Sequence, residues 1–179
     1  MTFRMQHLAA AAALATALCS PAWADKPIAM PTATAAEQAV LQKFVAAYMS
    51  GLPSNEYYDL TAQEVAEKIK ANKGDFVIVD VRVPKDKKFD KGHIPGAMFI
   101  GVMDLATPES LAKLPKDKDI IVHCDTGQQQ NKAVTALRLL GYKAHAMKWG
   151  YMAWSPAPPT ALTLAEIQKS ISPGYPVEK

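Results

Sequence analysis

Cys124 is the residue of this chain whose surroundings best fit a reactive group. It follows the apolar run Ile120-Ile121-Val122-His123, typical of a short buried strand, and precedes the polar segment Asp125-Thr126-Gly127-Gln128-Gln129-Gln130. Beyond that segment, apolar residues spaced along one face predict a helix: Ala133, Val134, Leu137 and Leu140. A thiol between a strand's carboxyl end and a helix's amino end lies among unpaired N–H groups and the positive end of the helix dipole. Both favour the nucleophilic thiolate, so the sequence predicts sulfur chemistry at Cys124.

The first 24 residues have the pattern of a secretory signal peptide. Arg4 supplies positive charge, an apolar run extends from Leu8 to Leu18, and Ala22-Trp23-Ala24 provides a small-x-small cleavage site. The run is too short for a spanning helix, although a retained membrane anchor is the alternative. We therefore expect cleavage after Ala24 and a periplasmic or secreted mature protein.

Cleavage would leave Cys124 as the only cysteine, in an oxidising compartment where it has no partner for an internal disulfide. An inert buried cysteine is the alternative, but such residues usually lie inside apolar elements rather than beside a polar, glycine-containing loop.

The mature chain would carry 19 basic and 17 acidic residues, because Arg4 is the one charged residue of the leader. This near-balance argues against nucleic acid or a membrane surface as a partner. The length fits one domain with one core, and we expect a monomer.

The chain divides at its composition changes. Residues 25–36 are predicted to be a linker, 37–56 an N-terminal helical extension, 57–155 the main domain, and 156–179 a C-terminal helix with a tail. The C-terminal helix is indicated by a capping box, Thr163 to Glu166. In the extension, Val40, Leu41, Phe44, Val45, Tyr48 and Met49 share one face of the helix Glu37–Ser50. We expect this helix to pack on the domain as a lid or brace, with partner binding as the alternative.

Short strands and helices alternate through the main domain. Strands are predicted at residues 76–79, 97–100, 120–123 and 144–147. Helices are predicted from the capping box Thr61–Glu64, from Thr107-Pro108-Glu109, and after Gln130 as far as Gly141. This alternation predicts an α/β domain with a mainly parallel sheet, whose ligands bind beyond the carboxyl ends of the strands. Cys124 lies at one of those ends.

Four motifs make residues Tyr57 to Trp154 resemble the rhodanese-like (thiosulfate sulfurtransferase-like) domain. They are Asp80-Val81-Arg82, the segment Phe89–Ile100 with its string Gly92-His93-Ile94-Pro95-Gly96-Ala97, the Cys124 loop, and Trp149-Gly150-Tyr151-Met152-Ala153-Trp154. The resemblance implies a central, mainly parallel β-sheet flanked by helices, with the N-terminal helix as an addition. It implies no metal and no cofactor.

The side chains around the predicted site have structural interpretations beside catalytic ones. Asp80 and Arg82 are expected to form a buried ion pair, with substrate binding as the alternative. His93 is expected to hold the Gly92–Gly96 turn through a backbone hydrogen bond, with a catalytic base as the alternative. His123 should face away from Cys124, because neighbouring side chains of a strand alternate. Trp149 and Trp154 are expected to pack in the core or at its rim.

The resemblance implies covalent catalysis of sulfur transfer. The Cys124 thiolate would take the outer sulfur of thiosulfate or a persulfide donor, and pass it to cyanide, a small thiol or a protein thiol. Backbone N–H groups of Asp125, Thr126, Gly127, Gln128, Gln129 and Gln130 would bind the terminal sulfur.

The loop departs from the family pattern. Gln129 and Gln130 occupy places where many members have arginine or lysine followed by serine, and Asp125 adds a negative charge. The nearest cation along the sequence is Lys132, so we expect weakened binding of thiosulfate, a dianion, and better use of a neutral or thiol-bound donor.

Other readings of the cysteine fit less well. A cysteine phosphatase would need an arginine at Gln130 to grip phosphate, and a zinc or haem site would need more cysteine and histidine ligands. The remaining alternative is a catalytically weak rhodanese-like module that binds partners or senses redox state.

Overall fold

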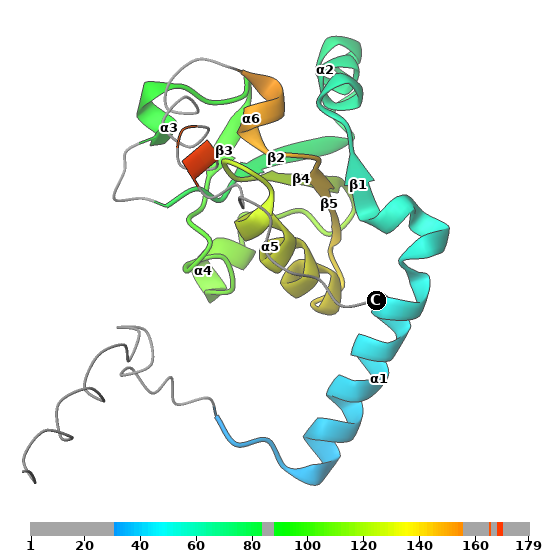
Figure 1. Ribbon diagram of the computed structural model, residues 1–179. Coiled ribbons are helices and arrows are strands. Elements are labelled where there is room, and N and C mark those ends of the chain that lie inside the picture. The colour runs from blue at the N-terminus through cyan, green and yellow to red at the C-terminus, as the bar shows by residue number, and fades with distance from the viewer. Residues whose placement is uncertain (1–30, 84–87, 156–164, 166–167, 170–179) are drawn as a thin grey trace, which may run out of the picture.

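The computed structural model describes residues 31–83 and 88–155, together with Ala165, Gln168 and Lys169. The predicted signal peptide and the Thr163–Glu166 capping box lie outside these residues. The described part is an α/β fold built on one sheet, with a long helix extending from one end (Figure 1).

The sheet has five parallel strands in the order β1-β5-β4-β2-β3. The strands are β1 (Asp59–Leu60), β2 (Phe76–Asp80), β3 (Ala97–Phe99), β4 (Asp119–His123) and β5 (Lys143–Met147). The predicted mainly parallel sheet is therefore confirmed. Strand β4 is central, and its carboxyl end lies between those of β2 and β5, where Asp80 pairs with His123 and Val122 with Ala146.

Helices cover both faces of the sheet (Figure 1). On one face, α4 (Pro108–Leu111) and α5 (Gln128–Leu139) enclose a core that includes Val79, Val122 and Leu137. On the other, α2 (Ala62–Ala71) and α6 (Tyr151–Trp154) pack against Ile78 and Ile121. The short helix α3 (Lys88–Lys91) precedes β3. Apolar residues on both faces of β2 and β4 explain why these strands read as continuous apolar runs.

Helix α2 begins as its sequence predicts. The Thr61 side chain accepts from the Glu64 backbone N–H, and the Glu64 carboxylate accepts from the Thr61 N–H, which is a complete capping box. It ends at Asn72, whose left-handed backbone closes the last turn.

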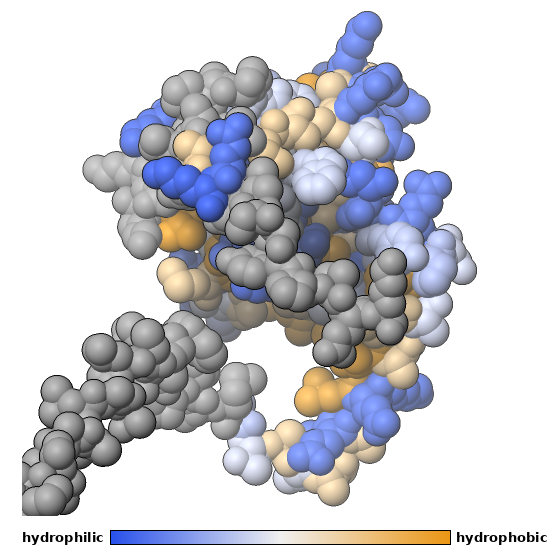
Figure 2. Space-filling model, viewed as in Figure 1, coloured by the Kyte–Doolittle hydropathy of each residue, from blue (hydrophilic) through white to orange (hydrophobic). Residues whose placement is uncertain are grey.

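Helix α1 (Ala35–Gly51) corrects the prediction of a packed lid or brace. It begins two residues earlier than predicted, because Thr34 and Glu37 form a capping box, and it continues into a 3-10 helix, η1 (Pro53–Tyr58). None of its residues is buried, and the large apolar ones are 42–57% exposed: Val40, Leu41, Phe44, Val45 and Met49. Figure 2 shows apolar side chains uncovered along this helix.

Helix α1 meets the domain near its carboxyl end. The Tyr48 hydroxyl lies 3.2 Å from the Thr135 hydroxyl of α5, and the Tyr48 ring stacks on Tyr58 with a centroid distance of 5.8 Å. Within the described ranges, no helix combines the length and the apolar character needed to cross a bilayer.

Candidate functional site

Cys124 directly follows β4 and lies at the carboxyl edge of the sheet, as its position in sequence predicts. Its side chain belongs to the core on the α5 face, together with Val122 and Ala133, and the residue is only 2% exposed. The thiol is free of disulfide bonding.

The loop after Cys124 is shorter than predicted, because α5 begins at Gln128 rather than after Gln130. Gly127 is the N-cap, with φ of 104°, a left-handed conformation that favours glycine. The Gly127 N–H points back to the sulfur and donates to Cys124 Sγ at 3.2 Å. Residues 125–127 thus form the loop, and residues 128–130 form the first helical turn.

The amino end of α5 has no side-chain cap among the described residues, so the N–H groups of its first turn lack the usual capping acceptor. Such N–H groups, with the helix dipole, favour negative charge nearby. Beside Cys124 they would stabilise a thiolate or the terminal sulfur of a persulfide.

A second segment holds the loop from the β5 side. The Tyr151 N–H donates to the Cys124 carbonyl at 2.7 Å, and the Met152 N–H donates to the Asp125 carbonyl at 2.9 Å. Gly150 makes this approach possible, since a Cβ there would lie 2.5 Å from the Cys124 carbonyl oxygen. The sequence signal for this contact was the glycine of the Trp149–Trp154 motif.

Trp149, beside Gly150, is not a core residue. It is 68% exposed and has φ of 63°, which is unusual for a residue other than glycine. Its backbone lies close to the loop, because a Cβ on Gly127 would meet the Trp149 Cα at 3.8 Å.

Asp80 and Arg82 form a buried ion pair beneath the loop. Arg82 Nη2 lies 2.6 Å from Asp80 Oδ2, Arg82 Nε donates to both carboxylate oxygens, and both side chains are fully buried. Arg82 Nη2 also donates to the Gly92 carbonyl at 2.6 Å, and the guanidinium lies 4.4 Å from the centre of the Tyr151 ring. The pair therefore ties the end of β2 to the Gly92 turn and to α6.

His123 faces this ion pair rather than the thiol. Its Nε2 lies 3.8 Å from Asp80 Oδ2, and its ring stacks on Tyr151 at a centroid distance of 5.9 Å. Burial holds the pKa of His123 below its ordinary value, and the nearby Asp80 carboxylate offsets only part of that effect. His123 is thus a buried neutral group on the face opposite Cys124.

Lys88 supplies a cation that the sequence alone did not place. Its Nζ lies 2.5 Å from Asp125 Oδ2, and Arg82 Nη1 lies 4.0 Å from Asp125 Oδ1. The carboxylate next to Cys124 is thereby balanced by positive charge from α3 and from the end of β2. Lys88 and Asp125 are 37 residues apart, and no local pattern joins them.

The side chain of Gln130 is buried and does not face the solvent beside the loop. It is 1% exposed, its Oε1 accepts from the Cys124 backbone N–H at 2.9 Å, and its Nε2 donates to the Met147 carbonyl. Gln129 and Thr126 are partly exposed, and Gln128 is exposed. A buried side chain for Gln130 was not predicted from the sequence, because glutamines in a polar segment usually face solvent.

His93 lies away from the sulfur, on the Gly92 turn. Its Nδ1 is 2.9 Å from the Phe89 carbonyl, and its ring stacks on the Phe89 ring at 3.9 Å. The residue is exposed. These contacts give it a local role in holding the turn.

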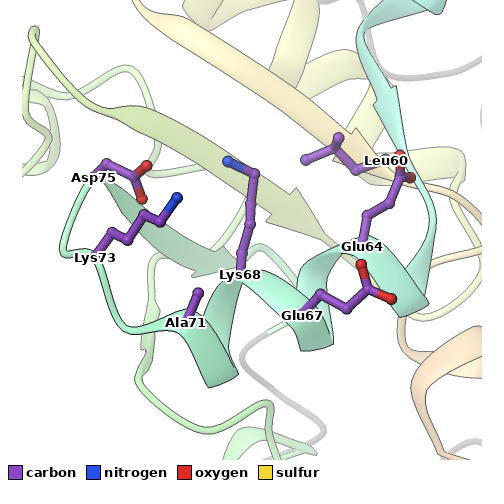
Figure 3. A pocket seen from close by; sticks show the side chains of 7 residues that line it. All are labelled: Leu60, Glu64, Glu67, Lys68, Ala71, Lys73 and Asp75. Carbon is purple, nitrogen blue, oxygen red and sulfur yellow. The ribbon is translucent and has the colours of Figure 1, made fainter.

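A hollow of about 350 Å³ lies elsewhere, beside α2 (Figure 3). Charged side chains line much of it, including Glu64, Glu67 and Lys68, and none of its lining residues was a predicted site residue. Glu64 is engaged in the α2 capping box, and Lys68 lies 3.5 Å from Asp119. Across the described ranges, no group of three or more histidine, cysteine or acidic side chains is placed to hold a metal.

Comparison with known proteins points to one family. The family model for the rhodanese-like domain matches residues 61–157. The chain is 30% identical over 99 residues to YtwF of Bacillus subtilis, which is named as a sulfurtransferase; the match covers 55% of this chain and 91% of that protein.

A second relative is a larger protein. MoeZ of Mycobacterium tuberculosis, named as an adenylyltransferase/sulfurtransferase, is 34% identical over 79 residues; the match covers 44% of this chain and only 20% of MoeZ. A solved protein from Lactobacillus plantarum has a TM-score of 0.50 at 23% identity, covering 59% of this chain and 88% of that one, and shows likeness of fold.

Proposed function

This chain belongs to the rhodanese-like domain family, and on that premise we propose that it is a sulfurtransferase that carries sulfur as a persulfide on Cys124. The observation that carries the proposal is the hydrogen bond from the Gly127 N–H to Cys124 Sγ at the uncapped start of α5. Relatives named as sulfurtransferases support the same chemistry.

The reaction has two displacements at sulfur. The Cys124 thiolate attacks the outer sulfur of the donor, forming a new S–S bond while the donor's bond to that sulfur breaks and the remainder leaves with the electron pair. From thiosulfate the leaving group is sulfite, and from a persulfide it is a thiolate. A thiolate or cyanide acceptor then attacks the terminal sulfur, and Cys124 leaves as thiolate. N–H groups of residues 125–130 would bind the terminal sulfur between the two steps.

We expect a persulfide to be a better donor than thiosulfate. The Asp125 carboxylate adjoins the reactive cysteine, and the nearby Lys88 ammonium is already engaged by it at 2.5 Å. A dianion would therefore meet little uncompensated positive charge from these side chains. A donor with a single negative charge would lose less binding free energy from the lack of uncompensated positive charge.

The proposed setting is the periplasm or the exterior, after removal of residues 1–24. Arg4, the apolar run and the Ala22-Trp23-Ala24 site support export. The intact mass of the protein recovered from its native host should correspond to a chain that begins at Asp25. A full-length mass would contradict export by this route.

A redox-sensing or partner-binding module is the second candidate, favoured by the burial of Cys124 at 2% exposure. A buried thiol reacts slowly with donors in solution. Such a module would keep the fold and the thiol but would not turn over sulfur.

Intact-mass analysis of the reduced protein separates the two candidates. The protein is exposed to thiosulfate or to glutathione persulfide, and cyanide is then added. A gain of one sulfur atom, lost to cyanide and absent in Cys124→Ser, is the expected result. No gain with either donor would reject sulfur transfer and leave the module.

A further inference from the structure

The hydrogen-bond ladder between β4 and β5 is interrupted just where the reactive cysteine begins. The last paired residues are Val122 and Ala146. The Cys124 backbone is directed toward the β5 side, because its carbonyl accepts from the Tyr151 N–H, whereas the His123 carbonyl accepts from Val81 at the end of β2. In a continued parallel ladder, the Cys124 N–H would donate to the Met147 carbonyl.

The side-chain amide of Gln130 stands between these two backbone groups. Its Oε1 accepts from the Cys124 N–H at 2.9 Å, and its Nε2 donates to the Met147 carbonyl. The partners fix the orientation of the amide, since one is a donor and the other an acceptor. We propose that Gln130 is a positioning residue for Cys124. The Gln130 amide replaces the hydrogen bond that a continued ladder would form between the Cys124 N–H and the Met147 carbonyl. It also holds the ends of β4 and β5 apart beside the loop of residues 125–127. This interaction is called the amide bridge below.

The chemistry of the bridge is specific to glutamine. Gln130 is 1% exposed, so both backbone groups and the amide itself would lack partners if the side chain changed. Asparagine is one methylene shorter and cannot make both bonds from the same helical position. Glutamate accepts from the Cys124 N–H, but its ionised form has no proton to donate to the Met147 carbonyl.

The bridge also links the strand end to the sulfur contacts. Gln130 lies in the first turn of α5, three residues after the N-cap Gly127, whose N–H donates to Cys124 Sγ at 3.2 Å. Fixing the Cys124 backbone against that turn therefore fixes Sγ relative to the N–H donors. A shift of about 1 Å at a reacting atom can cost roughly 100-fold in rate.

The inference rests on the proposed sulfur transfer, so the first measurement does not use that reaction. Hydrogen–deuterium exchange at the Cys124 amide is compared between the wild type and Gln130→Met, which keeps the chain length and removes both bonds. We expect exchange at Cys124 to rise at least about tenfold, with Val122 unchanged; equal protection in both proteins would overturn the amide bridge.

The second measurement tests positioning through its dependence on pH. In Gln130→Glu, the rate of persulfide formation from glutathione persulfide should fall about 10- to 100-fold relative to wild type at about pH 8. The ratio of the Gln130→Glu rate to the wild-type rate should recover toward one at low pH, because a protonated carboxyl can donate to the Met147 carbonyl again. The control is Gln42→Glu on the exposed face of α1, which makes the same chemical change far from the sulfur.

The outcomes separate this inference from the proposed function. A Gln130→Glu ratio that stays low at every pH, with native stability, would overturn positioning by the amide. If the wild type forms no persulfide, the proposed function fails, and the exchange comparison still decides whether Gln130 holds Cys124. If Gln130→Glu does not fold, Gln130→Met provides the rate comparison.

Discussion

Replacing Arg82 with methionine should destabilise the protein more than any surface change. The substitution keeps much of the aliphatic volume but removes the guanidinium from Asp80, whose side chain is fully buried. Breaking a buried ion pair from one side typically costs about 3–5 kcal/mol, because the other charge is left without a partner. The Gly92 carbonyl also loses its 2.6 Å hydrogen bond, which adds about 1 kcal/mol.

The expected loss for Arg82→Met is therefore about 4 kcal/mol or more at neutral pH, against a total stability of roughly 5–15 kcal/mol for a domain. The double variant Asp80→Asn/Arg82→Met removes both charges and should lose only about 1–2 kcal/mol, since no buried charge remains unpaired. Lower pH should also reduce the loss in the single variant, because a protonated His123, whose Nε2 lies 3.8 Å from Asp80 Oδ2, would balance the unpaired charge.

Urea unfolding followed by tryptophan fluorescence measures these differences directly. The wild type, the single variant and the double variant are compared at neutral and mildly acidic pH. Equal losses in the single and double variants would refute the reasoning, because the cost would then come from packing and not from an unpaired charge.

Three further predictions concern the loop after Cys124 and the pH dependence of stability. Gly150→Ala should lower the free energy of unfolding by about 1–3 kcal/mol in the same urea assay, because its Cβ would lie 2.5 Å from the Cys124 carbonyl oxygen; unchanged stability would contradict this close approach. Gln129→Arg should raise kcat/KM for thiosulfate about tenfold in the thiosulfate–cyanide assay, because it places a cation in the first turn of α5. The kcat/KM for the persulfide donor should change little. An equal gain with both donors would argue against charge as the reason. Stability should decline as pH falls below about 6.5, because burial holds the pKa values of His123 and His145 below that ordinary value and the unfolded chain takes up protons first. Urea unfolding from about pH 7.5 to 5.5 tests this, and His145→Gln should flatten the decline.

The parts of the fold that were predicted from sequence are those governed by local pattern. Strands β2 and β4 are continuous apolar runs because both of their faces are covered, and the start of α2 follows from the Thr61–Glu64 capping box. The place of Cys124 follows from the strand before it and the helix after it. Each of these signals lies within about ten residues of the feature it specifies.

The missed features depend on contacts between distant segments. Strand β1 has two residues, too few for a period, and exists because it pairs with β5. The Lys88–Asp125 ion pair joins α3 to the loop of residues 125–127, and its two residues are 37 positions apart in the sequence. The prediction that α1 packs on the domain is wrong. An apolar face indicates that a helix can be buried, but it does not show that this domain buries it.

Gln130 is a miss of a different kind, because the sequence carries a local signal for its burial. It is the last of three glutamines, of which Gln128 is exposed and Gln130 is buried. The difference arises from the helical phase of α5 relative to the sheet. Gln130 precedes Ala133, Val134 and Leu137 by three, four and seven residues, so the apolar periodicity that predicts the helix also places Gln130 on its buried face.

Because Cys124 is buried, we expect the rate at which a reagent reacts with it to depend on the size of that reagent. With only 2% of the residue exposed, a donor reaches the sulfur only when the residues that cover Cys124 move, so small donors would have an advantage over bulky ones unless a partner protein uncovers the thiol. The same enclosure would shelter a sulfur atom carried on Cys124 from water and from oxidants. The lifetime of the loaded state and the rate of loading would then both depend on how often Cys124 becomes uncovered.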